Sequence, residues 1–169
     1  MRPVRCAPLA LVLVLAGCRD GDQIIDPTDI DFAAELDIDL ARMTRTSTGL
    51  YIEDVTVGTG DAAADGDEVT LLYSGWLPDG MLFGTTDDDD IPLVRTLGVA
   101  DPTDGSRLIE GFREGVTGMQ VGGVRKLVIP PQLGYGAQAN GLIPPNSTLV
   151  FRVELISIGY RAVVPGAIP

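Results

Sequence analysis

The stretch VTLLYSGWLPDGMLF, residues 69–83, predicts two antiparallel strands joined by a tight turn. Its first part, Val69 to Trp76, is rich in the β-branched, apolar and aromatic residues that favour strands. The tripeptide Pro78-Asp79-Gly80 favours a turn, because proline presets φ, aspartate bonds to nearby backbone and glycine accepts positive φ. Met81 to Phe83 would then return beside the first strand. The domain around this hairpin is therefore expected to contain an antiparallel sheet.

Three further stretches on either side of the hairpin have the pattern of strands. Leu149 to Ile158 alternates apolar and polar side chains, which is typical of a strand with one buried face. Leu50 to Val57 is a β-prone run that ends at Gly58. Val124 to Ile129 is stopped by Pro130, because proline has no backbone donor for a sheet. The sequence thus predicts several antiparallel strands in one domain.

One segment breaks the β pattern and predicts a helix. Leu108, Phe112, Val116 and Met119 recur at spacings of four, four and three residues, so they would share one face of a short helix. Two glycines inside that helix each cost about 1 kcal/mol relative to alanine, so packing against the sheet must hold it. Strands with a single helix against them form an α+β domain.

A long glycine- and proline-rich stretch joins Ile129 to Leu149. Structureless loops of this length are uncommon inside compact domains and are usually functional. Tyr135 lies in this loop between two glycines, which is a poor setting for a core residue and a suitable one for a presented hydroxyl group. Tyr135 is therefore a candidate functional residue.

Composition excludes several kinds of chemistry. The 169-residue chain has no histidine, which rules out Ser-His-Asp and Cys-His catalysis and removes the commonest metal ligand. Its two cysteines, Cys6 and Cys18, lie near the N-terminus, so the rest of the chain can form neither a disulfide framework nor a thiolate metal site. A net charge of −12 opposes binding to nucleic acid and to anionic lipid headgroups. No metal or cofactor is expected.

The N-terminus is predicted to direct export and membrane anchoring. Residues 1–17 combine a short basic start with an apolar run that is too short to span a bilayer, as in a signal peptide. The run ends at Leu15-Ala16-Gly17-Cys18, which is similar to a bacterial lipobox, and this similarity implies that Cys18 is acylated. The alternative is an ordinary cleaved signal in which the cysteine is incidental.

Residues 18–46 are predicted to be an acidic tether between the lipid anchor and the domain. Phe32, Leu36 and Leu40 are spaced as on a short helix, although the aspartates between them weaken it. The domain itself would span residues 47–160, with a C-terminal tail at 161–169.

Five motifs follow one another along the domain: VTLLYSGW at 69–76, LPDGMLF at 77–83, LIEGFREGV at 108–116, KLVIP at 126–130, and GYG with IPPNSTLVF at 134–151. In this order they resemble the FK506-binding-protein (FKBP-type) family of peptidyl-prolyl cis-trans isomerases, over about residues 49–159. The resemblance implies a half-barrel, in which a curved antiparallel sheet wraps around one short α-helix.

The resemblance also implies a site between the sheet and the helix. Phe112 would form its floor under the substrate proline ring, the backbone N–H of Ile109 would bind one substrate carbonyl, and the Tyr135 hydroxyl would bind another. Catalytic roles fall on Tyr73, Phe83, Phe112, Tyr135 and Phe151, and substrate-binding roles on Leu93, Leu108, Ile109 and Ile143. Without the resemblance, the aromatic residues other than Tyr135 would be interpreted as ordinary core residues.

The implied reaction agrees with the absence of reactive groups. Rotation about an X-Pro amide faces a barrier of about 18–20 kcal/mol, because resonance stabilises the planar form. No covalent bond is made or broken, so no acid, base or nucleophile is needed. An apolar pocket that disfavours the charge-separated planar amide and fits the twisted one is sufficient.

Three positions depart from the family pattern. Gly84 stands where the family has an aspartate, so the Tyr73 hydroxyl would lose its partner, and a buried unpaired hydroxyl costs about 1–3 kcal/mol. Leu93 replaces a wall aromatic, and Phe112 stands where tryptophan is common. These changes predict reduced isomerase activity and weaker binding of macrolide ligands, with binding of proline-containing segments less affected.

Two functional hypotheses remain open at this stage. The first is a monomeric, lipid-anchored isomerase that assists the folding of exported proteins at the bacterial cell envelope, acting on proline-containing unfolded chains. The second is a binding module with weak or no catalysis, which holds clients as a chaperone or scaffold. Gly84 and Leu93 favour the second, and the intact set of Tyr73, Ile109 and Tyr135 favours the first.

Three further patterns carry less weight. Asp87 to Asp90 is a run of four acids whose spacing matches no established calcium loop, so a solvated loop is expected. Extra residues around Asp101 to Gly105 would lie beside the pocket entrance. Asn146-Ser147-Thr148 matches a glycosylation acceptor by formula only, inside a family motif.

Overall fold

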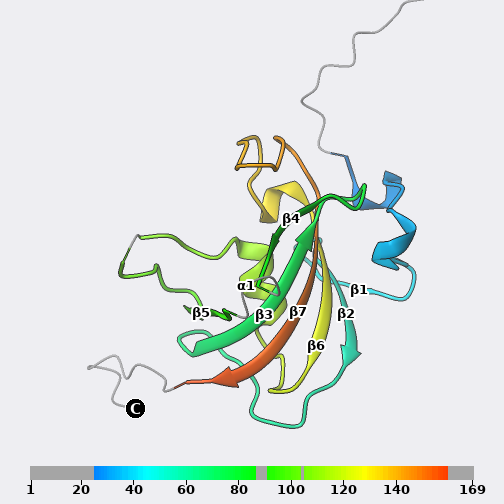
Figure 1. Ribbon diagram of the computed structural model, residues 1–169. Coiled ribbons are helices and arrows are strands. Elements are labelled where there is room, and N and C mark those ends of the chain that lie inside the picture. Colours follow the sequence, from blue (N-terminus) through cyan, green and yellow to red (C-terminus); the bar gives the residue numbers. More distant parts are fainter. Residues whose placement is uncertain (1–24, 87–90, 104, 160–169) are drawn as a thin grey trace, which may run out of the picture.

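The computed structural model describes residues 25–86, 91–103 and 105–159 of the chain (Figure 1). In these residues seven strands form one sheet, and every strand pair is antiparallel. The order across the sheet is β1-β2-β6-β7-β3-β4, and β5 pairs with the same edge of β3 as β4 does. The strands are β1 (Thr44–Arg45), β2 (Tyr51–Thr56), β3 (Glu68–Trp76), β4 (Leu82–Thr85), β5 (Leu93–Thr96), β6 (Val124–Ile129) and β7 (Leu149–Ile158).

The one α-helix in the described residues, α1 (Glu110–Val116), lies on the concave side of the curved sheet (Figure 1). The α+β half-barrel predicted from the sequence is confirmed. The helix is shorter than its apolar spacing suggested, because Leu108 precedes the N-cap residue and Met119 follows the C-cap residue. Three 3-10 turns complete the described elements: η1 (Pro27–Asp29), η2 (Ala34–Leu36) and η3 (Pro131–Leu133).

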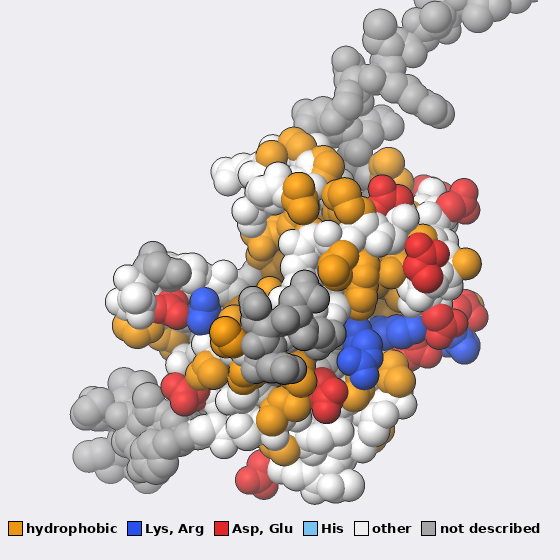
Figure 2. Space-filling view, viewed as in Figure 1, with side chains coloured by type: hydrophobic (Ala, Val, Ile, Leu, Met, Phe, Trp, Pro, Cys, Tyr) orange, Lys and Arg blue, Asp and Glu red, His pale blue; other side chains and the backbone are white. Residues whose placement is uncertain are grey.

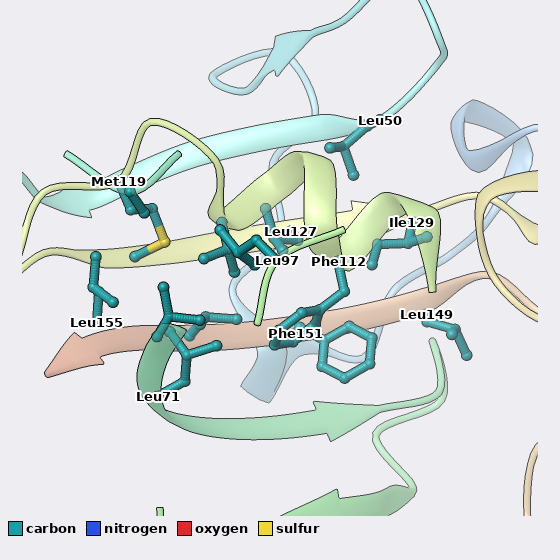
Figure 3. Close-up of a cluster of buried hydrophobic side chains, with 14 of the residues drawn as sticks. Leu50, Leu71, Leu97, Phe112, Met119, Leu127, Ile129, Leu149, Phe151 and Leu155 are labelled. Carbon is teal, nitrogen blue, oxygen red and sulfur yellow. The ribbon is translucent and has the colours of Figure 1, made fainter. Parts of the chain in front are cut away.

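The main hydrophobic core fills the space between α1 and the sheet (Figure 3). Two helix glycines allow α1 to lie this close to β6. A Cβ atom on Gly111 would come within 2.4 Å of Ile129 Cγ2. A Cβ atom on Gly115 would come within 2.5 Å of Leu127 Cδ1. The glycines that weaken the isolated helix are therefore the residues that permit its packing.

A third glycine brings two aromatic side chains together at one end of the sheet. Gly75 lies in β3 opposite Phe151 of β7 and Gly84 of β4. A Cβ atom on Gly75 would lie only 2.7 Å from Phe83 Cζ and 2.8 Å from Phe151 Cε1. The absence of a side chain at this position therefore lets the two phenylalanine rings meet over β3.

The N-terminal segment, residues 25–46, packs on the outer face of the sheet, on the side away from α1 (Figure 1). Leu36 and Met43 are buried there in a second cluster with side chains of β2, β6 and β7. The Ala33 N–H donates to Pro78 O at 2.8 Å, and Lys126 Nζ donates to Leu36 O at 3.1 Å. Ordered packing thus extends N-terminal to residue 47, where the sequence analysis placed the start of the domain.

The helical spacing within this segment does not form an α-helix. Residues 34–36 make a single 3-10 turn, and Asp37 then adopts a left-handed conformation with φ 48°, which ends the turn. An aspartate tolerates that conformation better than most residues do. The predicted short helix is therefore one 3-10 turn, followed by β1 at the edge of the sheet.

Several predicted features lie outside the described residues. They are the signal peptide at 1–17, Cys18 with its acylation, the Asp87–Asp90 run and the tail at 161–169. Within the described residues, no helix is long and apolar enough to cross a membrane.

Candidate active site

A cavity of about 390 Å³ opens between α1, the ends of β3, β4 and β7, and the loop before β7. All nine residues that the sequence analysis singled out for the pocket line it. The lining also includes five residues that the analysis did not assign to the pocket wall. The full set is Tyr73, Phe83, Gly84, Leu93, Arg107, Leu108, Ile109, Phe112, Tyr135, Asn140, Gly141, Leu142, Ile143 and Phe151.

Four aromatic rings form the inner part of the cavity. The Phe112 and Phe151 ring centroids are 5.2 Å apart at an interplanar angle of 79°. Tyr73 lies edge-on to Phe112 at 5.9 Å, and Phe83 lies edge-on to Phe151 at 5.4 Å. Edge-to-face packing is a favoured geometry that fixes each ring against its neighbour. Phe112 keeps 3% of its surface exposed and Phe151 keeps 5%, so these two rings form a rigid apolar floor.

Ile109 is placed by the start of α1. It is the N-cap residue with φ −59° and ψ 148°, and its carbonyl accepts from the Phe112 N–H at 3.0 Å and the Arg113 N–H at 3.1 Å. Its own N–H forms no hydrogen bond within the described residues. This backbone donor is therefore available to a ligand at the edge of the cavity.

Tyr135 is presented by a loop with its own hydrogen bonds. The loop begins with η3 and is closed by the Gly136 N–H donating to Pro131 O at 2.9 Å and by the Asn146 N–H donating to Gly136 O at 2.7 Å. Gly136 has φ 58°, a conformation that favours glycine directly after the tyrosine. The glycines around Tyr135 thus serve the turn that orients the side chain.

Burial raises the pKa of the Tyr135 hydroxyl above its usual value near 10, and a hydrogen bond with the Asn140 side chain partly offsets this effect. A raised pKa keeps the phenol protonated at neutral pH. The group is therefore a hydrogen-bond donor, which is the role required for binding a carbonyl oxygen.

Gly84 leaves space beside Tyr73. A Cβ atom on Gly84 would lie 3.5 Å from Tyr73 Oη, which is ordinary van der Waals contact, and the backbone there has no positive φ. Within the described residues the Tyr73 hydroxyl has no hydrogen-bond partner, and it is not among their buried, unpartnered oxygen atoms. The hydroxyl thus remains open to the cavity, and the cost expected for a buried unpaired hydroxyl does not arise.

The outer wall of the cavity is aliphatic. Leu93 lies in β5 opposite Leu71 and is half-buried, and Ile143 is 6% exposed. Leu142 beside it is 64% exposed at the rim. In the extra segment predicted to lie beside the entrance, the Gly105 N–H donates to Asp101 O at 2.8 Å in a turn, and neither residue lines the cavity.

Sequence reasoning missed Arg107, Asn140, Gly141 and Leu142 as lining residues. Arg107 and Leu142 each directly precede a predicted pocket residue, Leu108 and Ile143, so neighbouring position was the available signal. Asn140 forms a backbone bridge with Ile143 across the loop, which no local pattern indicates. These four residues, Gly141 included, are brought to the cavity by loop geometry.

The cavity offers binding without a reactive group. Its lining within the described residues contains no carboxylate, and no group of three or more acidic side chains gathers in that part of the chain to hold a metal ion. What it provides is an aromatic floor, an open backbone N–H and a protonated phenol. A pocket of this kind, between the helix and the sheet of a half-barrel, suits the binding of an extended apolar peptide segment without covalent chemistry.

Comparisons with known proteins identify the family. The FKBP-type peptidyl-prolyl cis-trans isomerase family matches residues 60–156. The chain is 47% identical over 111 residues to the FK506-binding protein of Neisseria meningitidis serogroup B, which covers 65% of this chain and 96% of that protein. It is 42% identical over 115 residues to a peptidyl-prolyl cis-trans isomerase of Schizosaccharomyces pombe, covering 67% and 97%. The chain belongs to the FKBP-type peptidyl-prolyl cis-trans isomerase family.

Solved structures agree with this result. The crystal structure of FkpA from Escherichia coli superposes with a TM-score of 0.61 at 42% identity, covering 69% of this chain and 51% of that one. The crystal structure of AtFKBP13 superposes with a TM-score of 0.62 at 32% identity, covering 69% and 98%. The protein is thus an FKBP-type isomerase, a family that binds proline peptides and FK506-type ligands.

Proposed function

We propose that this isomerase assists the folding of exported proteins at the bacterial cell envelope, where a lipid on Cys18 holds it. The lipobox-like Leu15-Ala16-Gly17-Cys18 supports the location. The observation that carries the activity is the gathering of nine predicted residues around one cavity. Uncatalysed X-Pro isomerisation takes tens to hundreds of seconds, so it limits folding outside the cytoplasm as it does inside.

The proposed mechanism uses the cavity as follows. The substrate proline ring lies on Phe112 and Phe151, while the Ile109 N–H and the Tyr135 hydroxyl bind carbonyl oxygens on either side of the X-Pro bond. The apolar surroundings disfavour the charge-separated planar amide, and the shape of the pocket favours the twisted one. The amide rotates within the pocket, and no proton or covalent bond is transferred.

The lipid would hold the domain close to the membrane. The residues that pack on the outer face of the sheet begin at Phe32, so residues 19–31 separate Cys18 from them. An extended chain spans at most about 3.3–3.6 Å per residue, so Cys18 and Phe32 would be separated by at most about 50 Å. Acyl chains supply about 0.8 kcal/mol per buried methylene, which compensates for the repulsion between the acidic domain and anionic headgroups.

The location is tested by labelling the full-length protein with a radioactive or clickable palmitate in a Gram-negative host. We expect the wild type to carry the label and to sediment with membranes, and Cys18→Ser to lose both properties. An unlabelled wild type in the soluble extracytoplasmic fraction would refute the anchor and leave the isomerase assignment intact. Cys6→Ser is the matched control, because Cys6 would be removed with the signal peptide.

A second candidate function is client holding with little catalysis. Among the described residues that line the cavity there is no carboxylate, and Gly84 lies beside Tyr73 instead; this favours the holding function, as does the aliphatic Leu93. A cis–trans relaxation assay on a short X-Pro peptide with residues 19–169 distinguishes the two candidates. Acceleration of the relaxation supports the enzyme, whereas binding of the same peptide without acceleration supports the holding function.

A further inference from the structure

Most basic side chains in the described residues are paired with acidic ones. On the face shown in Figure 2, basic side chains lie next to acidic ones. Arg45 instead lies over the Tyr51 ring, 5.7 Å from its centroid. The ion pairs among the described residues join Arg42 to Asp37 and Asp39, Arg95 to Asp101, Arg113 to Asp65 and Glu110, Arg125 to Asp54, and Lys126 to Asp37.

Arg107 differs from these residues. Within the described residues it forms neither an ion pair nor an aromatic contact, and Arg152 is the only other basic residue there of which this is true. The Arg107 Nη1 donates to Gly98 O at 3.1 Å, which anchors one end of the guanidinium group. Within the described residues its remaining donors have no partner, so they can bind a carboxylate.

Arg107 also occupies a distinctive position. It is the only charged residue among those described that line the cavity, and it lines a second, smaller hollow of about 80 Å³ beside the start of α1. The other residues that line that hollow are Gly98, Val99, Leu108, Glu110 and Arg113, and the Glu110 carboxylate is paired with Arg113. Arg107 and Leu108 thus line both the cavity and the smaller hollow.

We propose that Arg107 is a specificity-determining residue that favours substrates with an acidic side chain adjacent to the proline. The proposal rests on the proposed active site. Arg107 lies two positions before Ile109, whose N–H would bind a substrate carbonyl, and adjacent residues of an extended chain are about 3.8 Å apart. A planar guanidinium binds a carboxylate through two parallel hydrogen bonds.

The net negative charge of the protein increases the effect that Arg107 would have on substrate choice. A protein with a net charge of −12 repels acidic segments at long range. A single positive charge at the site can then determine which substrates bind, because specificity is the difference between the affinities for two substrates. Arg107 would locally reverse the repulsion, so that acidic residues next to proline are tolerated or preferred.

The test compares peptides that differ by one charge. Cis–trans relaxation would be measured for Glu-Pro against Gln-Pro and for Pro-Glu against Pro-Gln, at low salt, with the full chain lacking its signal peptide. The readout is the ratio of kcat/KM for the acidic peptide to that for its neutral partner. We expect Arg107→Gln to lower this ratio roughly two- to fivefold for at least one pair, and Arg107→Glu to lower it further.

Arg152→Gln is the matched control. Arg152 is exposed on β7, lies on the outer face beside Leu36 and Trp76, and also lacks an ion pair within the described residues. Its substitution changes the net charge by the same amount, so it measures the effect of long-range repulsion alone. Added salt should shrink the Arg107 effect, since exposed charges are screened over about 10 Å at 0.1 M.

The outcomes separate the inference from the proposed active site. If both ratios in Arg107→Gln equal those in Arg152→Gln, Arg107 does not determine specificity and the inference is overturned. If Arg107→Gln slows acidic and neutral peptides equally, the residue supports the fold or the site in general, and the inference is likewise overturned. If the wild type accelerates neither Gln-Pro nor Pro-Gln, the proposed catalytic site itself fails.

Discussion

Position 84 lies beside the Tyr73 hydroxyl, so the residue found there affects the polarity of the pocket. Gly84 leaves Tyr73 Oη facing open space, and a Cβ atom would lie 3.5 Å from that oxygen. A carboxylate there could accept a hydrogen bond from the Tyr73 hydroxyl, and hydrogen bonds to charged groups contribute about 1.5–3 kcal/mol. Within the described residues the Tyr73 hydroxyl has no such partner, and the reduced activity expected from this difference stays a prediction.

Gly84→Asp is expected to raise kcat/KM in the peptide relaxation assay by up to about tenfold, if about 1.4 kcal/mol of the new interaction is expressed in the transition state. Gly84→Ala is the control, because it adds the Cβ atom without the carboxylate. Equal rates for the two variants would show that the missing aspartate does not limit catalysis in this chain.

Whereas position 84 lacks a polar group, Tyr135 already supplies one, because the loop orients its hydroxyl group. Tyr135→Phe should lower kcat/KM roughly two- to tenfold, because one neutral hydrogen bond contributes about 0.5–1.5 kcal/mol. Tyr51→Phe, on the outer face of the sheet, controls for loss of a tyrosine hydroxyl in general. An equal effect of both substitutions on the relaxation rate would argue against a role for Tyr135 in the site.

The raised pKa of Tyr135 predicts how stability changes at alkaline pH. The folded-state pKa lies above the unfolded value near 10, so the stabilising contribution is complete below that value. It is lost as pH rises through the folded pKa, because the buried phenol must then ionise. Urea unfolding between about pH 9 and pH 11 should show a smaller loss of stability for Tyr135→Phe than for the wild type. If the wild type and Tyr135→Phe lose the same amount of stability, ionisation of this phenol is not linked to folding.

At the scale of elements, the contact between α1 and β6 depends on glycine. Propensity alone would make alanine at a helix position more favourable by about 1 kcal/mol. At Gly115, however, a Cβ atom would lie 2.5 Å from Leu127 Cδ1, far inside contact distance. Helix and sheet would have to separate, and α1 carries Phe112, the floor of the cavity.

Gly115→Ala is therefore expected to lower the free energy of unfolding by about 1–3 kcal/mol in urea denaturation, against its helix propensity. A second comparison makes the same substitution in a Leu127→Ala background. The clashing leucine atoms are absent there, so Gly115→Ala should leave the free energy of unfolding unchanged or raise it. The same loss in both backgrounds would show that the steric explanation is wrong.

The loop before β7 is the other element that shapes the site. Tyr135, Asn140 and Ile143 come from it, and its hydrogen bonds run mainly within the loop and to η3. Turn chemistry of this kind is local, so the sequence already marked the loop as functional. Which of its side chains face the cavity depends on how it closes over the sheet.

At the scale of the whole molecule, the half-barrel has two apolar clusters on opposite faces of the sheet. The inner one supports the site, and the outer one is covered by residues 25–46. The Lys126 ammonium links the two layers, and its hydrogen bond holds the pKa of the Asp37 carboxyl below its usual value. The N-terminal segment is thus part of the folded unit, and it contacts the β3–β4 turn that leads to Phe83.

Leu36→Ala is expected to lower the free energy of unfolding by about 2 kcal/mol, the lower end of values for buried leucines, because Leu36 is 7% exposed under the outer cluster. Ile25→Ala, at 53% exposure in the same segment, should change it by less than about 0.5 kcal/mol. Thermal and urea unfolding of the two variants provide the comparison. A Leu36 variant as stable as the Ile25 variant would mean that the segment adds nothing to the fold.

The sequence by itself determined the sheet, the helix and most of the site. Five motifs in one order resemble the FKBP-type family, and that resemblance implied a single pocket for Tyr73, Phe112 and Tyr135. Alternation, turn residues and the helical spacing are local patterns, and they predicted the strands and the helix. Such patterns succeed because side-chain periodicity follows directly from strand and helix geometry.

Only the tertiary structure decided the rest. Residues 25–46 carry weak local signals, and they become ordered because the outer face of the sheet offers them an apolar surface. Gly111 and Gly115 disfavour the isolated helix. Only the structure shows that a side chain at either position would clash with Ile129 or Leu127. Arg107 is likewise an ordinary arginine in the sequence. Its position at the cavity, without a carboxylate partner in the described residues, results from contacts between segments distant along the chain.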